Sequence, residues 1–329
     1  MAESKHDKMV AKVEEARKQA VETIIEMMES KGLYWTQEWG NAFGAGSMPR
    51  NGASGRWYAG GNAIHLMATA YRRGFKDPRW FTFKQAKGVG FFPAKGEKAA
   101  LVEYYKRFKG MKDAEGNWTT DEDEAEETFS YMKLVGCFWV FNAEQLYDKD
   151  GNQMPLEVET EPAEDEMLDG HLCEVADNLI ETSRCPVIEE RGEMSAFYRP
   201  GADEVHVPSR TQFTCMEGFV STLAHEMAHS TMKPLKRTAG GRFGSDAYAY
   251  EELVAELGST FVCLELGVHR TAELEGDENF ENHAAYLKSW LRNFRNDTSY
   301  LFKAASEAGR AATYIIGKYN GENAEDRAA

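Results

Sequence analysis

Residues 221–231 read STLAHEMAHST and contain the spacing H-E-x-x-H. Helical residues four apart lie one turn apart on the same face, so His225 and His229 can both reach one tetrahedral metal ion. Glu226, beside the first histidine, can take a proton from the water that such an ion activates. We therefore predict a metal centre with His225 and His229 as ligands and Glu226 as the catalytic base. A solvated helix face is the alternative, because this spacing arises by chance in about one chain in a hundred of this size.

The residues around the motif predict an amphipathic helix. Thr214 and Glu217 fit a capping box, so we expect a helix over residues 215–231. One arc of this helix is apolar, and the motif lies on the opposite side. The helix would then pack one face on a core and present the other to the ion. The apolar arc consists of Phe219, Val220, Leu223, Ala224, Met227 and Ala228.

A catalytic zinc site takes a third protein ligand and leaves its fourth position to water. The stretch YAYEELVAELG, residues 248–258, predicts a second helix with Glu252 and Glu256 on one face. We expect Glu252 to be the third ligand and Glu256 to accept a hydrogen bond from a ligand histidine. Glu251 or Glu256 could instead be the ligand, whereas no histidine follows at the spacing of a third imidazole ligand. Zinc (Zn2+) is the expected ion, although such a site also accepts manganese or cobalt (Mn2+ or Co2+).

The composition indicates a globular protein. The chain has 329 residues, of which 42% are hydrophobic, so it can bury a substantial core, and its length suggests two domains. We find no secretory leader and no apolar run of about 18 residues, so we expect a soluble, cytoplasmic protein without a membrane partner. The five cysteines form no C-x-x-C pair, which argues against a disulfide framework and a thiolate zinc site. An amphipathic pattern over residues 5–30 predicts a first helix that packs on the core.

Charge is distributed unevenly along the chain. The net charge is -16, yet residues 40–109 contain 13 Lys and Arg against 3 Asp and Glu, whereas residues 110–329 contain 19 against 43. This pattern is typical of a chain in which one domain engages a polyanion. Aromatic residues are interleaved with the cations, a combination that holds single-stranded nucleic acid by its phosphates and its bases. We predict that single-stranded DNA contacts Arg56, Trp57, Tyr58, Arg79, Trp80, Phe83, Lys84, Lys95 and Lys98.

These residues also have an ordinary structural explanation. Lysines and arginines commonly form a solvated surface, and a Trp or Phe is more often part of a core than a platform for bases. Thr82 and Gln85 fit a capping box, which by itself accounts for part of the stretch TFKQ. Both explanations stay open on the sequence alone.

The remaining patterns predict where strands lie. Residues 98–108 and 129–142 are β-prone runs that we assign to one N-terminal sheet. The acidic stretch at 112–129 indicates a seam between the two halves. Further strands are expected in CPVIEE, SAFYRP and DEVHVP, the last two as a hairpin. Residues 204–207 would form an edge strand that can pair with an extended peptide, with His206 at the surface.

Seven stretches, taken in order, resemble the ArdC antirestriction family. They are PRNGASGRWYAGGN (49–62), DPRWFTFKQA (77–86), KGEKA (95–99), FNAEQ (141–145), HEMAHST (225–231), YAYEELVAELGSTF (248–261) and AAYLKSWL (284–291). The resemblance covers most of the chain. The seven stretches in this order identify the family more specifically than any one of them does. Ser230 departs from the pattern, because family members commonly have tryptophan after the second histidine, and the acidic insert at 112–129 is long. The first departure bears on substrate preference and the second on how the domains sit together.

The resemblance implies an α+β protein of two domains. With the boundaries that the acidic stretches suggest, these are an α+β single-stranded-DNA-binding domain over residues 1–150, a linker over 151–165, and a mostly helical, zincin-like metallopeptidase domain with a small sheet over 166–329. The resemblance also implies an antirestriction protein of a plasmid or phage, which protects incoming DNA from host restriction and carries a gluzincin-like H-E-x-x-H…E site.

Two other functions stay open. The chain could bind single-stranded DNA and block restriction without proteolysis, with the metal as a structural element. It could also be a DNA-dependent protease that acts on DNA-bound or crosslinked proteins. The protein substrate or restriction machinery that it would meet is not indicated by the sequence.

Overall fold

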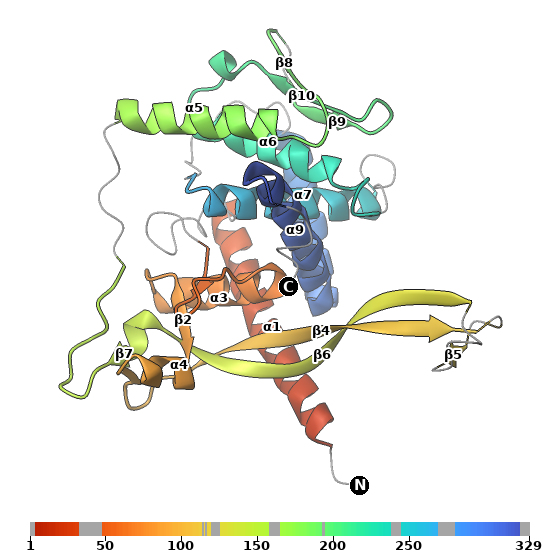
Figure 1. Cartoon of the computed structure of the whole chain (residues 1–329). Helices are drawn as coiled ribbons and strands as arrows, with labels where there is room; N and C mark the ends of the chain where they lie inside the picture. Colours follow the sequence, from red (N-terminus) through yellow and green to blue (C-terminus); the bar gives the residue numbers. More distant parts are fainter. Residues whose placement is uncertain are drawn as a thin grey trace.

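The computed structural model describes residues 4–32, 48–113, 115, 117–119, 126–157, 165–192, 195–237, 245–268 and 280–322. Figure 1 shows a part built on a long twisted sheet and, stacked on it, a helical part with a small sheet. Helix α1 (Lys5–Lys31) runs from the first part into the second, and α3 (Gly60–Arg73) lies between them. This mixed architecture confirms the expected α+β fold class.

The larger sheet has five strands in the order β1-β2-β6-β4-β5. Its two long strands, β4 (Ala100–Lys112) and β6 (Glu127–Asn142), pair antiparallel over the whole of β4, so the two β-prone runs share one sheet as expected. The shorter strands β2 (Arg79–Thr82) and β1 (Arg50–Asn51) continue the sheet beyond β6. A separate two-stranded sheet joins β3 (Phe92–Pro93) to β7 (Leu146–Tyr147), which follows the short 3-10 helix η2 (Ala143–Gln145).

The acidic stretch at 112–129 does not divide the chain, so its interpretation as a seam is wrong. It connects β4 to β6 and includes β5 (Trp118–Thr119), which pairs with the end of β4. Polar, charged residues are equally typical of the connection between two hairpin strands, because such connections generally lie at protein surfaces. The proposed domain boundaries stay predictions, and residues 158–164 of the expected linker lie outside the described part of the chain.

Capping boxes begin two helices beside the sheet. Ser4 and Asp7 cap each other's backbone at the start of α1, which begins where the sequence predicts. Thr82 and Gln85 form the predicted box at the start of α4 (Phe83–Gly88). The apolar stripe of α1 faces inward as expected, and its buried members are Val13, Ala20, Ile24 and Met28.

The second part consists of five helices and a small sheet among the described residues. The helices are α5 (Asp165–Glu181), α6 (Met216–Ser230), α7 (Asp246–Glu265), α8 (Phe280–Asn296) and α9 (Thr298–Tyr319). The sheet has the order β8-β10-β9, with β8 (Val187–Glu190), β9 (Phe197–Arg199) and β10 (Glu204–Pro208), and the 3-10 helix η3 (Arg210–Gln212) leads on to α6. None of the described helices is both long and apolar enough to cross a lipid bilayer.

Strand β10 is not an edge strand. It forms the predicted antiparallel hairpin with β9, but it also pairs in parallel with β8 on its other side. The expectation that residues 204–207 offer a free edge to a peptide is therefore wrong, since the neighbouring strands take up its backbone groups. His206 is buried, not at the surface, and its ring stacks on Phe197 at 4.8 Å between ring centroids.

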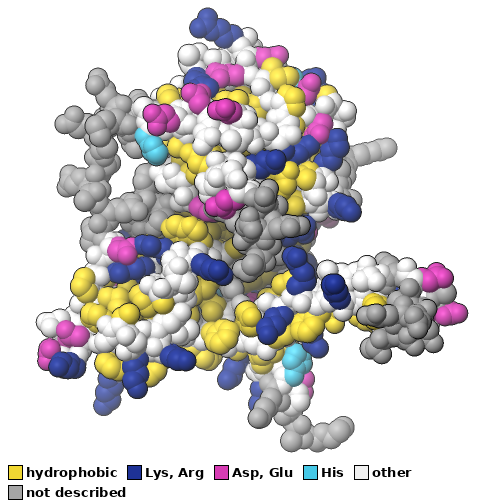
Figure 2. Space-filling view, in the orientation of Figure 1, with side chains coloured by type: hydrophobic (Ala, Val, Ile, Leu, Met, Phe, Trp, Pro, Cys, Tyr) yellow, Lys and Arg dark blue, Asp and Glu magenta, His cyan; other side chains and the backbone are white. Residues whose placement is uncertain are grey.

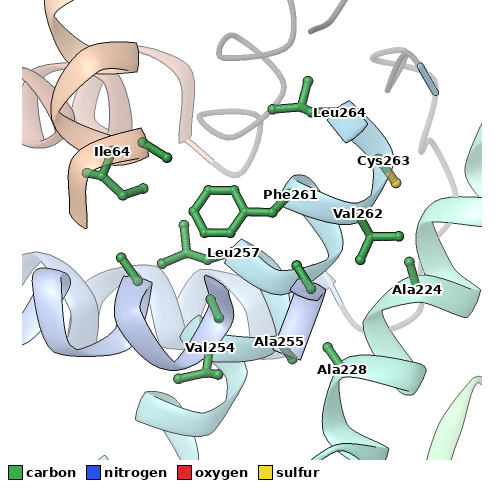
Figure 3. Packing of buried hydrophobic residues seen from close by; sticks show 14 of the residues in the cluster. Ile64, Ala224, Ala228, Val254, Ala255, Leu257, Phe261, Val262, Cys263 and Leu264 are labelled. Atoms are coloured by element: carbon green, nitrogen blue, oxygen red, sulfur yellow. The ribbon is translucent and has the colours of Figure 1, made fainter. Parts of the chain in front are cut away.

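One hydrophobic core joins the two parts. In Figure 3, Ile64 of α3 points toward Leu257 and Phe261 of α7, and Ala224 and Ala228 of α6 lie on the other side of α7. All five side chains are almost completely buried. Because burial of apolar surface is the main stabilising contribution, neither part has a complete core without the other.

The contact between α3 and α9 depends on glycine. A Cβ added to Gly309 of α9 would lie 2.8 Å from the backbone nitrogen of Gly60, closer than real side chains approach. Gly60 itself has a φ of 56°, a left-handed conformation that glycine adopts without strain. The backbones of the two helices can approach this closely only where side chains are absent.

We expect Gly309→Ala to lower the free energy of unfolding by about 1–3 kcal/mol, because α3 and α9 must move apart to admit the methyl group. Urea unfolding followed by circular dichroism measures this change. The matched control is Gly170→Ala in α5, where a Cβ meets nothing within 4 Å, and which should leave stability unchanged or raise it by up to about 1 kcal/mol. Equal stability of Gly309→Ala and wild type would contradict the close contact.

Candidate metal centre

Helices α6 and α7 carry the candidate ligands and pack closely against each other. A Cβ on Gly258 of α7 would lie 3.1 Å from the Cβ of Ala228 of α6. Ser259 donates a hydrogen bond of 2.8 Å from its hydroxyl to the backbone oxygen of Ser221, which fixes one helix against the other. A small residue and a buried hydroxyl thus set the spacing at which side chains of α6 and α7 meet.

The start of α6 differs from the prediction. The N-cap is Cys215, whose side chain caps nothing, so the Thr214 and Glu217 capping box is wrong. The third helical residue is Gly218, which has no side chain to complete such a box. The predicted apolar arc of six residues is buried throughout, so the orientation of the helix is as expected.

The structure brings His225, His229 and Glu252 together. The Nε2 atom of His225 lies 3.6 Å from one carboxylate oxygen of Glu252, and the Nε2 atom of His229 lies 3.6 Å from the other. One ligand atom from each residue lies within 4.8 Å of the others. Two ligands bound at about 2.1 Å to a tetrahedral ion stand roughly 3.4 Å apart, so this donor set fits a single zinc-sized ion.

The second nitrogen of each imidazole faces its own carboxylate. The Nδ1 atom of His229 lies 3.2 Å from Glu251, and that of His225 lies 3.6 Å from Glu256. Such carboxylates fix the tautomer and orientation of metal-binding histidines. Glu256 therefore stands where it was expected, whereas Glu251, an alternative ligand in the sequence, faces Nδ1 rather than Nε2. Glu252 is the carboxylate placed between the two Nε2 atoms.

The histidines and glutamates of the site shift one another's pKa values. Burial alone would lower the pKa of His225, but contacts with Glu252 and Glu256 and the charge of Glu226 raise this pKa well above its ordinary value. Burial would raise the pKa of Glu252, yet the two histidines lower it to about 2. Glu252 is therefore ionised and available to balance a cation. Glu226 is largely buried and lies next to His225 on α6.

Sequence reasoning missed three side chains at this site. Arg237, almost completely buried, contacts both oxygens of Glu251 at 3.1 and 3.2 Å and donates to the backbone oxygen of Ala228 at 2.7 Å. Burial and the charge of Glu252 raise the pKa of Tyr248 and raise that of Tyr286 to about 12. Tyr248 could have been found, because it precedes Glu252 by one helical turn. Arg237 could not, since it lies in an irregular segment after α6.

Two residues predicted to bind DNA have structural roles. Trp80 is fully buried and packs edge-on against Phe75. The prediction that its ring contacts single-stranded DNA is therefore wrong. Arg79 donates to Asp77 at 2.6 Å and to the backbone oxygen of Pro155 at 2.6 Å, and it is largely buried. These contacts hold the strand β2 in place and leave the guanidinium little room to bind phosphate.

The other predicted DNA contacts lie at or near the surface. Tyr58 is half-buried and its hydroxyl accepts a hydrogen bond from Asn51. Trp57 is stacked near Arg50, with 5.7 Å between the guanidinium carbon and the ring centroid, and Phe83 lies 6.5 Å from Phe92. The exposed members of the set are Arg56, Trp57, Phe83, Lys84, Lys95 and Lys98. Their role in binding DNA stays a prediction.

Comparison with protein families assigns each part of the chain. Residues 14–141 match the N-terminal domain of anti-restriction factor ArdC. Residues 174–307 match a zincin-like metallopeptidase family, and this range contains the candidate metal centre. The two matches follow the order of the two parts in the fold.

Curated relatives include two large proteins and one of similar size. Two proteins named DNA primase TraC from Escherichia coli are 31% identical over 313 residues and 32% identical over 303 residues, which cover 91% and 90% of this chain. The chain spans only 27% and 19% of their lengths. An uncharacterized protein of Sinorhizobium fredii, y4eC, is 29% identical over 294 residues that cover 89% of this chain and 88% of that protein.

Two solved structures share the fold over nearly the whole chain. The metal-free structure of the antirestriction protein ArdC from plasmid R388 has a TM-score of 0.64 and 29% identity, and the match covers 93% of this chain and 98% of that one. The Mn(II)-bound structure of the same protein has a TM-score of 0.62 and 28% identity, with coverage of 92% and 97%. A protein of this fold thus holds a divalent ion.

We expect Glu252→Gln to lose most of its affinity for Zn2+ or Mn2+, because the neutral amide neither balances the ion nor bridges the two Nε2 atoms. Glu251→Gln should weaken binding by about 10- to 100-fold, since it releases the orientation of His229. Calorimetric titration of the metal-stripped protein measures both. Glu217→Gln, a mostly buried carboxylate at the far end of α6, is the control and should bind like wild type. Unchanged affinity in Glu252→Gln would exclude this donor set.

Proposed function

This chain belongs to the ArdC antirestriction family, and on that basis we propose that it binds single-stranded DNA and carries a zinc peptidase centre that protects incoming DNA from host restriction. The N-terminal part would hold the DNA, and the zincin-like part would act on a protein. Placement on a plasmid or phage is part of the same proposal. The metal centre, the peptidase activity and the binding of DNA are each supported by separate observations.

The observation that carries the proposal is the donor set on α6 and α7. His225, His229 and Glu252 converge from two helices, and Glu226 follows the first histidine directly. Two imidazoles and one carboxylate, with a fourth position left to water, are the ligand set of catalytic rather than structural zinc sites. Manganese is compatible with the same donors, and the ArdC protein of plasmid R388 has a Mn(II)-bound structure.

Each residue of the site has a distinct task in peptide hydrolysis. His225, His229 and Glu252 would hold a divalent ion, which would supply a water of lowered pKa and polarise the scissile carbonyl. Glu226 takes the proton of the attacking water and passes it to the leaving amine. Glu251 and Glu256 face the Nδ1 atoms of His229 and His225, where they would accept a proton and leave the Nε2 atoms free to hold an ion. Arg237 holds Glu251 in place for this contact.

DNA binding is supported by the charge of the N-terminal part. Residues 40–109 carry a strong excess of cations in an otherwise acidic chain. Cations release counterions from phosphates, and exposed aromatic rings such as Trp57 and Phe83 favour unpaired bases. The relatives named DNA primase are much longer than this chain, so their activity is not carried over to it.

We expect Glu226→Gln to bind the metal like wild type but to lose protection of unmodified DNA that enters a restricting host. Loss of a general base slows hydrolysis by about 10²- to 10⁴-fold, while the three ligands stay intact. Transfer efficiency of a plasmid with restriction sites measures protection, and metal analysis of the purified variant is its control. Full protection by a metal-loaded Glu226→Gln would instead assign the function to DNA binding or to direct blocking of the restriction enzyme.

A further inference from the structure

Strands β4 and β6 extend beyond the body of the protein as a two-stranded ribbon. Figure 1 shows the ribbon reaching away from the helices toward β5. In Figure 2 this arm carries Lys or Arg and hydrophobic side chains along its surface, and Asp or Glu side chains at its far end. Exposed apolar side chains at this density commonly mark an interaction surface.

Aromatic residues collect on one face of this ribbon. We call this surface the aromatic face, and it consists of Tyr104, Phe108, Trp118, Phe129, Tyr131 and Phe138. Strand residues two apart, and residues directly paired across two strands, point to the same side. Phe108 pairs with Tyr131, and Gly110 pairs with Phe129, which places them on the side of Tyr104.

The rings form two groups in a row along the ribbon, with the pair Lys106 and Lys133 between them. Tyr104 and Phe138 lie 5.8 Å apart between ring centroids, as do Phe108 and Tyr131. Trp118 lies 5.0 Å from Phe129 and 5.3 Å from Tyr131. The part of β4 beneath the row, residues 104–112, spans about 27 Å.

The rings are open to solvent although they touch one another. Trp118 is 62% exposed, Phe138 is 50% exposed and Tyr104 is 42% exposed. Gly110 makes room for the row, because a Cβ there would lie 2.7 Å from the ring of Trp118 and 2.8 Å from that of Phe129. The aromatic face thus presents ring surface that nothing in the described part of the chain covers.

Lysines lie between the rings. Lys106 stands 5.9 Å from the ring centroid of Tyr104, and Lys112 stands 5.4 Å from that of Phe129. Lys106 and Lys133 are direct partners across the two strands. Like charges in directly opposed positions destabilise a strand pair, and an anion bound between them would relieve this repulsion.

The opposite face of the ribbon is closed near the body. Arg17 of α1 donates to Glu103 at 2.7 Å, and Tyr105 donates to the same carboxylate at 2.7 Å. These contacts attach the ribbon to α1. The aromatic face lies on the other side of the ribbon and takes no part in these contacts.

We infer that the aromatic face of the ribbon holds single-stranded DNA, with bases on the rings and phosphates at Lys106 and Lys133. Lys112 is not counted among the phosphate contacts, because its direct partner across the strands is Glu127. The inference rests on the proposed DNA-binding function and moves its main contact away from the residues at 56–98. Aromatic faces bind unpaired bases regardless of sequence, whereas the bases of a duplex are already stacked on one another. The alternation of cations and rings therefore selects single strands.

Fluorescence anisotropy with a labelled oligothymidine of about 20 nucleotides, longer than a typical single-strand site, tests the inference on the full chain. We expect Phe108→Ala and Phe138→Ala each to weaken binding by about tenfold or more, because each removes a stacking partner. The matched control is Met132→Ala, an exposed apolar residue that pairs with Arg107 on the opposite face. It should bind like wild type. Circular dichroism melting of each variant checks that the fold is kept.

The salt dependence of binding gives a second readout. Each lysine that neutralises a phosphate adds about 0.7 to the slope of log K against log salt for a single strand. The double variant Lys106→Gln, Lys133→Gln should therefore reduce the slope by about 1.4. A duplex of the same sequence should bind more weakly than the single strand.

The outcomes separate this inference from the proposed function. If the wild type binds no single-stranded DNA, the DNA-binding part of the proposed function fails and the inference with it. If the wild type binds but the ribbon variants bind equally well, only the inference fails. Loss of binding in Trp57→Ala or Lys84→Ala without loss in the ribbon variants would assign the DNA to the other surface. Tighter binding of the duplex than of the single strand would also overturn the inference.

Discussion

The close approach of α6 and α7 is the constraint on which the candidate metal centre depends. Ala228 and Gly258 meet at a contact too close for a larger side chain, and the hydroxyl of Ser259 donates a hydrogen bond to the backbone of α6. His229 directly follows Ala228, so its imidazole is carried to the point where α7 offers its carboxylates. A larger side chain at Gly258 would separate the helices and with them the ligand atoms, although no ligand would have changed.

Helix α7 also links the metal centre to the N-terminal part. One face of α7 carries Glu252, while Leu257 and Phe261 pack toward Ile64 of α3. Helix α9 lies against both α7 and α3, and its Gly309 contacts the backbone of Gly60. The part expected to bind DNA and the part expected to bind metal therefore share packed side chains. Proteins close to bound DNA would meet the metal centre from a restricted set of orientations.

Two carboxylates and an arginine that are not themselves metal ligands orient the two ligand histidines. Each imidazole has its own acceptor, Glu251 or Glu256, and Arg237 fixes the first of these. The ribbon shows the converse arrangement, in which Lys106 and Lys133 face each other without a paired carboxylate among the described residues. The two regions are thus suited to ligands of opposite charge, and we expect a cation between α6 and α7 and a polyanion along β4 and β6.

The sequence by itself determined the elements with a local cause. It predicted the helix of the H-E-x-x-H motif, the second glutamate helix, the capping box at Thr82 and the pairing of the two long strands, because periodicity, capping and strand propensity act between near neighbours. Tertiary structure alone decided that Trp80 and His206 are buried, that β10 is a central strand and that Arg237 meets Glu251. These outcomes depend on which surfaces pack together, and packing joins residues that are distant in the chain and have no spacing to reveal them.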